Sequence, residues 1–91
     1  MTRAEVAVVN RLGLHARPSA RLTATAGRFQ AEVWLSKGDR RVNAKSIMGV
    51  MMLAAGCGST LVIEAEGSDE AQAVEAVRAL IASGFGEGES A

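Results

Sequence analysis

The sequence predicts a two-layer α+β domain, in which helices lie on one face of a single four-stranded sheet. The chain has 91 residues, of which 48% are hydrophobic, so it can form one small domain around one core. Its apolar pattern changes several times between the strand period and the helix period, in the order β-α-β-β-α-β-α. One sheet with helices on one face is the economical way to bury a single apolar side of each element.

Four segments have the character of strands. Residues 4–9 are short and rich in β-branched side chains, while residues 31–36 and 60–66 alternate between apolar and polar positions. The sequence Lys37-Gly38-Asp39 predicts a turn into a partner strand at 40–43, and therefore a hairpin. The inward positions of the alternating strands are expected to be Ala31, Val33, Leu35, Leu61, Ile63 and Ala65.

Two helices are predicted in the first two thirds of the chain. Residues 16–26 are rich in alanine, and Gly27 is a plausible residue to end this helix. Residues 47–54 form a short apolar helix before Gly56-Cys57-Gly58, and we expect Cys57 to be an inert loop thiol. The first helix is expected to gather on one face Ala16, Ala20, Thr23 and Ala24.

The last helix has the clearest signals. Ser68 or Asp69 caps its start, Glu70 favours its positive end, and Gly84 ends it. Its apolar stripe comprises Ala73, Val74, Val77, Leu80 and Ile81. We therefore assign residues 1–84 to one domain and residues 85–91 to a flexible C-terminal tail.

Composition excludes several classes of protein. One histidine and one cysteine cannot supply the three or four ligands of a zinc site. Neither a metal nor an organic cofactor is expected. No apolar run approaches the roughly 18 residues that span a bilayer, and the first residues lack the apolar core of a signal peptide, so we expect a cytoplasmic protein without membrane insertion. Two aromatic residues precede residue 80 and no basic run exceeds two residues, which argues against a nucleic-acid partner.

Charge is unevenly distributed along the chain. Residues 1–48 contain nine Lys and Arg against three Asp and Glu, whereas residues 49–91 contain one Arg against seven acidic residues. This asymmetry indicates a surface that meets a charged partner, or two halves that are each simply solvated by their own charges.

The segment from Asn10 to Ser19 carries the candidate chemistry. Gly13 permits a sharp bend, and Pro18 suits the first turn of a helix, so His15 is placed at or just before a helix N-terminus. That position stabilises an anion and disfavours a protonated imidazole, and a neutral imidazole is a usable nucleophile toward phosphorus. Arg17 can meet phosphate oxygens in pairs. A lone histidine at a helix start is more often a cap or a buried ring, but its combination with Gly13, Arg17 and Pro18 favours phosphoryl transfer.

The sequence Gly13-Leu14-His15-Ala16-Arg17-Pro18 resembles the phosphorylation-site signature of the HPr phosphocarrier family of the bacterial sugar phosphotransferase system. A second segment, residues 43–51, resembles the regulatory serine segment of the same family and contains Ser46. The resemblance extends to about residue 83. It implies an open-faced β-sandwich with an antiparallel sheet in strand order 1-4-2-3 and three helices on one face.

The resemblance also implies a function. His15 would accept a phosphoryl group on Nδ1 from phosphoenolpyruvate-charged Enzyme I and pass it to Enzyme IIA proteins for sugar uptake, with Arg17 as the phosphate clamp. Such a protein is a phosphoryl carrier and not an independent enzyme, and we expect it to be a monomer. Leu12 departs from the polar residue that many sugar-branch members have before Gly13, and the surrounding stretch also resembles carriers of the nitrogen-related branch.

Ser46 has a structural and a regulatory interpretation. It is expected to cap the helix that follows it. The resemblance implies in addition that HPr kinase/phosphorylase phosphorylates it, which would add roughly −1.5 to −2 charges near a partner-facing surface. Because a helix this apolar cannot bury every side chain against one sheet, we expect Ile47, Met48 and Met51 to form an exposed docking surface.

Two alternatives have other functions. A regulatory interaction module would keep the fold and Ser46 but act by binding a transcription factor or an enzyme. A ferredoxin-like sensor of small ligands has similar numbers of elements, but would need a glycine-lined site between subunits, which the sequence does not resemble.

Overall fold

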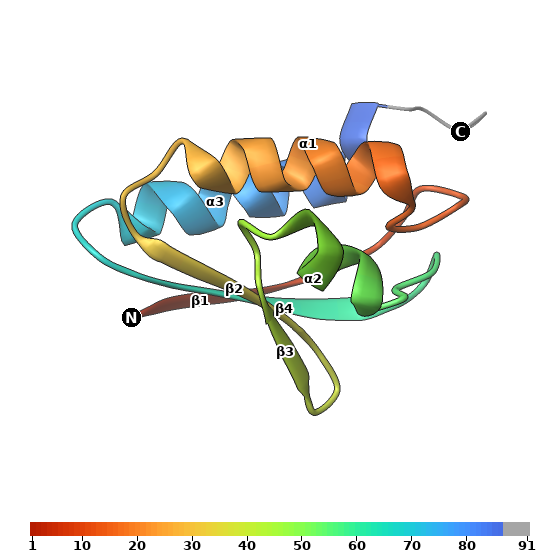
Figure 1. Cartoon of the computed structure of the whole chain (residues 1–91), viewed down its shortest axis with the longest axis horizontal. Helices are drawn as coiled ribbons and strands as arrows, with labels where there is room; N and C mark the ends of the chain where they lie inside the picture. The colour runs from red at the N-terminus through yellow and green to blue at the C-terminus, as the bar shows by residue number, and fades with distance from the viewer. Residues whose placement is uncertain (87–91) are drawn as a thin grey trace.

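The computed structural model describes residues 1–86 and forms two layers, a sheet and a layer of helices (Figure 1). The strands and helices occur in the predicted order and end in one short 3-10 helix, η1. Their bounds are β1 Thr2–Ala7, α1 Ala16–Gly27, β2 Glu32–Lys37, β3 Arg40–Asn43, α2 Ile47–Met52, β4 Thr60–Glu66, α3 Glu70–Ala82 and η1 Gly84–Gly86. None of the helices within residues 1–86 is long and apolar enough to cross a lipid bilayer.

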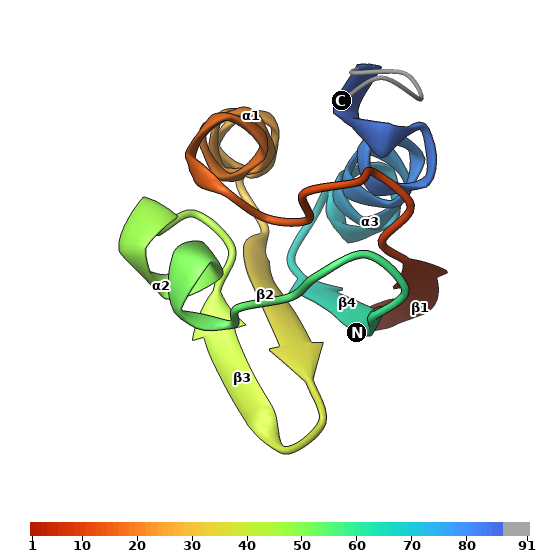
Figure 2. The same ribbon diagram turned by 90° about the vertical axis from the view of Figure 1, so that its right-hand side faces the viewer.

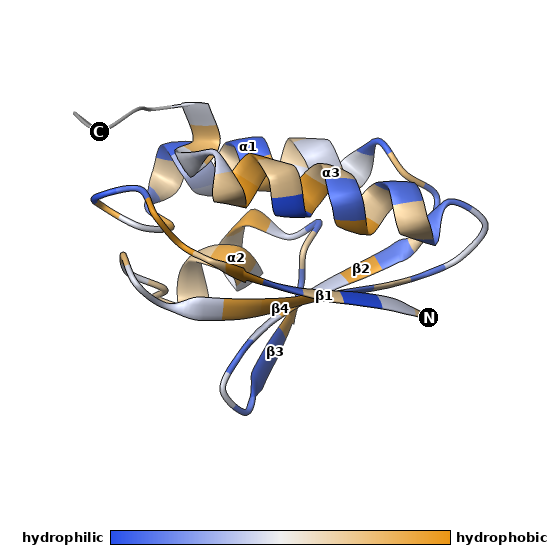
Figure 3. Ribbon diagram, turned by 180° about the vertical axis from the view of Figure 1, so that it is seen from behind, coloured by the Kyte–Doolittle hydropathy of each residue, from blue (hydrophilic) through white to orange (hydrophobic). Residues whose placement is uncertain are grey.

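The sheet is antiparallel and has the strand order β1-β4-β2-β3. All three α-helices cover the same face, so the predicted open-faced β-sandwich is confirmed (Figures 1 and 2). The hairpin between β2 and β3 is also confirmed, and its tip is strongly hydrophilic (Figure 3).

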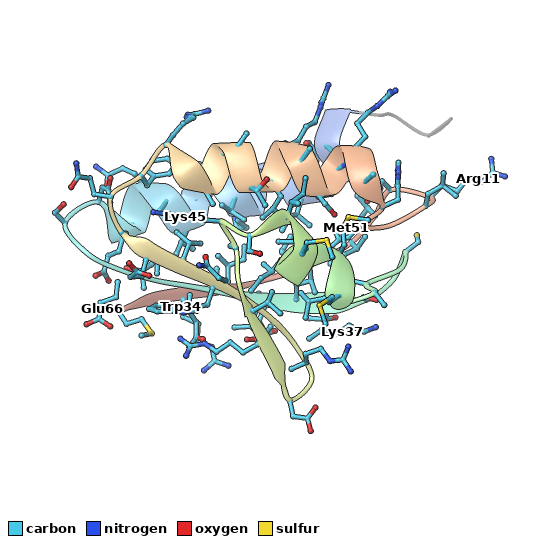
Figure 4. The ribbon with its side chains drawn as sticks, viewed as in Figure 1. Arg11, Trp34, Lys37, Lys45, Met51 and Glu66 are labelled. Carbon is cyan, nitrogen blue, oxygen red and sulfur yellow. The ribbon has the colours of Figure 1, made fainter. Side chains whose placement is uncertain are left out.

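The core lies between the helices and the sheet. Along β2 and β4, every position predicted to point inward is buried. The outer face of the sheet stays open and polar: Trp34 points away from the helices (Figure 4), and the Arg41 guanidinium lies 4.2 Å from the centre of its ring. Arg41 Nε also lies 3.3 Å from Glu64 Oε1.

Strand β1 begins earlier than predicted, at Thr2 instead of residue 4, and ends at Ala7 instead of residue 9. Its ends follow its pairing with β4, from Thr2 opposite Ala65 to Ala7 opposite Thr60. Local β-propensity therefore did not set the ends of this edge strand, because the length of its neighbour did.

The face of α1 that the sequence singles out for its alanines is not the buried face. The buried residues of the helix are Pro18, Ser19, Leu22 and Ala26, whereas Ala16, Ala20 and Ala24 are exposed. Leu22, the one large aliphatic side chain of the helix, dominates the gain from burial and so sets the orientation. The hydroxyl of Ser19 is satisfied inside the core because it donates to the carbonyl oxygen of Leu14 at 3.1 Å.

The ends of the helices differ from prediction in three places. Gly27 is the last residue of α1, and Arg28 follows in the right-handed conformation, so no left-handed glycine ends this helix. Helix α2 ends at Met52 instead of residue 54, and Ala54 is exposed at φ 52°. Asp69 precedes α3 as predicted, but its side chain makes no capping hydrogen bond.

The C-terminal boundary also needs correction. Gly84 has φ +71° and follows the end of α3 as predicted. Phe85, which we had assigned to the tail, is fully buried and belongs to the core. Its aromatic ring gains more by burial than a residue in a solvated tail could. The rest of the predicted tail, residues 87–91, lies outside the described residues.

Candidate functional site

His15 is the N-cap residue of α1, where the sequence placed it. Its backbone is extended, with φ −77° and ψ −170°, and its carbonyl oxygen accepts the N–H of Ser19 at 3.0 Å. The side chain makes no capping hydrogen bond. The position of His15 at a helix start is therefore not explained by the imidazole acting as a cap.

The imidazole of His15 is half-buried, and its two nitrogens differ in environment. Atom Nε2 has almost no accessible surface. A bulky electrophile cannot reach this nitrogen without a movement of the ring, so the geometry favours reaction at Nδ1. A neutral imidazole with its proton on Nε2 leaves a lone pair on Nδ1.

The start of α1 is a favourable place for an anion. The first N–H groups of an α-helix have no partner within the helix, and here these belong to Ala16 and Arg17, since Pro18 has none. The first turn contains no acidic residue. Arg17 is exposed and, within residues 1–86, forms no ion pair, so its guanidinium is available to a bound phosphoryl group.

A tight turn brings the chain to His15. Gly13 donates its N–H to the carbonyl oxygen of Asn10 at 3.1 Å, and the Asn10 side chain returns a bond from Nδ2 to the carbonyl oxygen of Gly13 at 2.8 Å. Asn10 is buried and is not among the site residues predicted from the sequence. An asparagine that ends an apolar run and stands three residues before a glycine is a pattern that indicates such a turn.

Gly13 has two reasons to be glycine. Its φ is +67°, and a Cβ atom there would lie 2.3 Å from the carbonyl oxygen of Ala55 and 2.7 Å from the Cα atom of Gly56. The backbone of the turn therefore lies directly against the segment that follows α2. Leu14 secures this contact by donating its N–H to the oxygen of Ala55 at 2.9 Å.

Ser46 is the N-cap residue of α2, as predicted. Its backbone is extended, and its hydroxyl oxygen accepts the N–H of Gly49 at 3.1 Å. A further hydrogen bond, from the N–H of Lys45 to Asn43 Oδ1, shapes the connection that precedes it. The structural role of Ser46 is confirmed, and its phosphorylation stays a prediction.

Helix α2 presents an apolar surface, which we call the α2 patch and which consists of Ile47, Met48, Met51 and Met52. These side chains are between 40% and 66% exposed, whereas Val50 and Leu53 of the same segment are buried. Helix α2 lies beside α1 (Figures 1 and 2), and Met51 is visible on it in Figure 4. The three predicted docking residues are thus exposed together, and Met52 joins them.

The C-terminal end of α2 is held by two cationic side chains that are not among the site residues predicted from the sequence. Arg40 Nη1 donates to the carbonyl oxygen of Met52 at 2.8 Å, and Lys37 Nζ donates to that of Ala54 at 3.1 Å. Basic side chains suit the negative end of a helix. Both come from the β2–β3 hairpin and border an open cavity of about 370 Å³, which Asp39, Leu53 and Ala54 also line.

Other residues near the turn before α1 are exposed. Arg11 projects away from the domain (Figure 4), and Leu12 is 64% exposed. Cys57 is also exposed, with its Sγ atom 3.7 Å from the carbonyl oxygen of Val9.

Comparisons with known proteins agree with this geometry. Residues 2–83 match the family model described as the phosphorylation site of the HPr component of the phosphotransferase system. The phosphocarrier protein HPr of Cupriavidus necator is 56% identical over 89 residues, which cover 98% of this chain and all of that protein.

Solved structures show the same relationship. HPr from Thermoanaerobacter tengcongensis superposes with a TM-score of 0.92 at 44% identity, covering 96% of this chain and 98% of that one. Crh from Bacillus subtilis, a catabolite repression protein solved as a swapped dimer, has a TM-score of 0.75 at 40% identity, covering 92% of this chain and 97% of that one. Sequence and fold together therefore show that the chain belongs to the HPr phosphocarrier family of the phosphotransferase system.

Proposed function

We propose that His15 accepts a phosphoryl group on Nδ1 from phosphoenolpyruvate-charged Enzyme I and passes it to Enzyme IIA components for sugar uptake. The observation that carries this proposal is the placement of His15 at the start of α1, with Nε2 buried and the exposed Arg17 two residues away. Nucleophile, anion site and cation are thus supplied by one helix end.

The transfer needs no external oxidant or reductant. The lone pair of Nδ1 attacks phosphorus, an N–P bond forms, and the bond between phosphorus and the donor atom of Enzyme I breaks, with its electron pair staying on the donor. In the second transfer a nucleophile on Enzyme IIA attacks the same phosphorus, and the electron pair of the N–P bond returns to Nδ1.

Residues around Nδ1 stabilise the migrating group. The N–H groups of Ala16 and Arg17 face the anion that forms at the helix end, and the guanidinium of Arg17 forms charge-assisted bonds to phosphoryl oxygens. Such preorganised donors act most strongly where negative charge develops in the transition state.

The α2 patch is the docking surface in this proposal. Methionine side chains adapt to different partner surfaces, which suits a protein that must bind both a donor and an acceptor. Helix α2 lies beside α1, so a partner seated on the patch also reaches the start of α1. We propose that the chain acts as a monomer in the cytoplasm.

Ser46 is proposed as a regulatory site for HPr kinase/phosphorylase. Its hydroxyl already lies at the start of α2, next to Ile47 and Met48 of the patch. A phosphate there would be stabilised by the helix end and would place a dianion at the edge of the docking surface.

A regulatory interaction module is the second candidate. The resemblance to Crh, a catabolite repression protein, and the position of Ser46 beside the α2 patch favour it. A carrier of the nitrogen-related branch would use the same chemistry at His15 with different partners.

The deciding experiment incubates the purified chain with Enzyme I and labelled phosphoenolpyruvate. We expect stoichiometric labelling that is stable to base and labile to acid, as for an N–P bond, and no labelling of His15→Ala. Wild-type protein that stays unlabelled, but is phosphorylated on Ser46 by the kinase, would reject the carrier proposal in favour of the regulatory module.

A further inference from the structure

The C-terminal turn η1 has an unusual backbone. Gly84, Phe85 and Gly86 are consecutive residues with positive φ, at +71°, +61° and +72°. A residue with a side chain avoids this region, because its Cβ atom comes too close to the following carbonyl oxygen. Phe85 nevertheless adopts it and buries its whole side chain. Burial of the ring therefore holds the turn in a conformation that the free chain end would leave.

Turn η1 lies against the segment that leads from β1 to His15 (Figure 2). A Cβ atom on Gly84 would lie 3.7 Å from the side chains of Val9 and Asn10. Asn10 in turn bonds to the oxygen of Gly13, two residues before His15. The turn thus supports the segment on the N-terminal side of the phosphorylation site.

A side chain from the helix that follows His15 also binds to η1. Arg21, in the second turn of α1, donates from Nη1 to the carbonyl oxygen of Phe85 at 2.5 Å. A Cβ atom on Gly86 would lie 3.2 Å from the same Nη1 atom. Turn η1 therefore bridges the two segments that flank His15, namely the turn before it and the helix after it.

We propose that Arg21 is a positioning residue for phosphoryl transfer, which acts through Phe85 and Asn10 to fix the turn that carries His15. This inference rests on the proposed carrier function. Arg21 does not touch the reacting group. Its bond to Phe85 keeps η1 against Val9 and Asn10, and so limits the orientations of His15 relative to the start of α1. Small losses of such alignment slow reactions strongly.

The test compares transfer from Enzyme I to four variants. In Arg21→Ala we expect kcat to fall roughly 3- to 10-fold, with KM for the carrier changed less than about 2-fold and folding retained. Arg21→Lys keeps a donor and is expected to recover most of kcat. Gly84→Ala strains the turn at φ +71° without changing charge, and should lower kcat in the same way. Gly38→Ala is the matched control, because φ is +61° there and a Cβ atom meets nothing within 4 Å.

A charge effect on docking would look different. It would raise KM in Arg21→Ala, weaken with added salt, and be absent from Gly84→Ala. That pattern, or an unchanged kcat in Arg21→Ala, overturns the proposal.

A second measurement separates this inference from the carrier function. Amide hydrogen exchange of Gly13 and Leu14 reports on the turn with no transfer partner present. We expect faster exchange in Arg21→Ala and Gly84→Ala than in wild type and Gly38→Ala. If the exchange of Gly13 and Leu14 is unchanged in these variants, the positioning role is rejected, even when Enzyme I labels the wild-type chain normally. A wild-type chain that Enzyme I does not label rejects the carrier function, whatever the exchange result.

Discussion

The backbone N–H of Leu14 donates to the carbonyl oxygen of Ala55 at 2.9 Å, and so ties the residue before His15 to the segment after α2. Gly13 makes this approach possible, because it has no Cβ atom at a point where the oxygen of Ala55 would be only 2.3 Å away. His15 and helix α2 are thus both anchored to one stretch of backbone.

We expect Gly13→Ala to damage both stability and transfer. The left-handed backbone alone costs roughly 1–2 kcal/mol, and relief of the contact with Ala55 adds to it, for a total of about 3 kcal/mol or more. Because the relief must move Leu14 and His15, transfer from Enzyme I should fall as well. Urea unfolding and transfer kinetics measure the two effects.

Gly38→Ala is the control for that substitution as well. It shares the positive φ but has open space at the Cβ position, so it should lose only about 1–2 kcal/mol and transfer normally. Equal destabilisation by the two substitutions would show that the contact with Ala55 contributes nothing.

Arg17→Ala is expected to leave the fold nearly intact and to slow transfer. The side chain is exposed, so the free energy of unfolding should change by only about 0.5 kcal/mol. Transfer should fall by a much larger factor, because a charge-assisted contact to the migrating group is lost. Arg28→Ala, at the end of the same helix, removes the same charge away from His15 and is the control. Identical kinetics for the two variants would show that Arg17 does not act on the migrating phosphoryl group.

Ser46→Asp and Ser46→Ala separate capping from regulation. Asp can cap α2, so the first variant should stay folded, but its charge beside the α2 patch should raise KM for transfer from Enzyme I. Ala should lose the bond to the N–H of Gly49, worth about 1 kcal/mol, and transfer normally. Thermal melts and steady-state kinetics test both. An unchanged KM in a folded Ser46→Asp protein would leave Ser46 as a cap alone.

Asp69 should make the free energy of unfolding decrease as the pH falls into the acid range. Its carboxylate accepts the N–H groups of Gln30 and Ala31, both at 2.9 Å, and the bond from Gln30 is the main reason that the pKa of Asp69 lies below its ordinary value of 3.8. The folded state thus prefers the ionised form. The contribution of Asp69 to stability is therefore fully present above the unfolded pKa, near 3.8, and is lost as the pH falls through the lower folded value.

Acid titration of the unfolding free energy measures this contribution. Asp69→Asn should flatten the decline below about pH 4 and lower stability at neutral pH. Asp39→Asn, in the hairpin turn, is the control, because no hydrogen bond ties that side chain to another segment of residues 1–86. A decline that is as steep in Asp69→Asn as in wild type would contradict the assignment.

Much of the fold followed from local patterns, and the failures occur where local patterns are weak or where distant segments decide. Ser46 at the start of α2 and the inward positions of β2 and β4 were predictable, because caps and alternation depend on nearby residues. The inner face of α1 was not, since a helix rich in alanine has no strong stripe and Leu22 alone turns it toward the core. Phe85 was missed because its burial depends on packing against distant segments.

The candidate site also contains residues that the sequence could predict and supports that it could not. His15 and Arg17 lie two residues apart in the sequence, so both belong to the start of the helix once it begins there. The supports of that helix start come from remote positions, such as the oxygen of Ala55 and the Arg21 bond to Phe85. Bonds from backbone oxygens leave no trace in residue identity, which is why the sequence did not predict them.

The short α2 patch beside a single histidine constrains how a carrier can work. The α2 patch has four side chains on a six-residue helix, so it can supply only part of the ~800 Å² per partner of a standard interface, and we expect each proposed complex to be short-lived. In the proposed mechanism the phosphoryl donor and the acceptor both dock on the α2 patch, so they would not bind at the same time. The overall rate of phosphoryl transfer would then be limited by dissociation from each partner. A mutation that tightened either complex would slow the transfer.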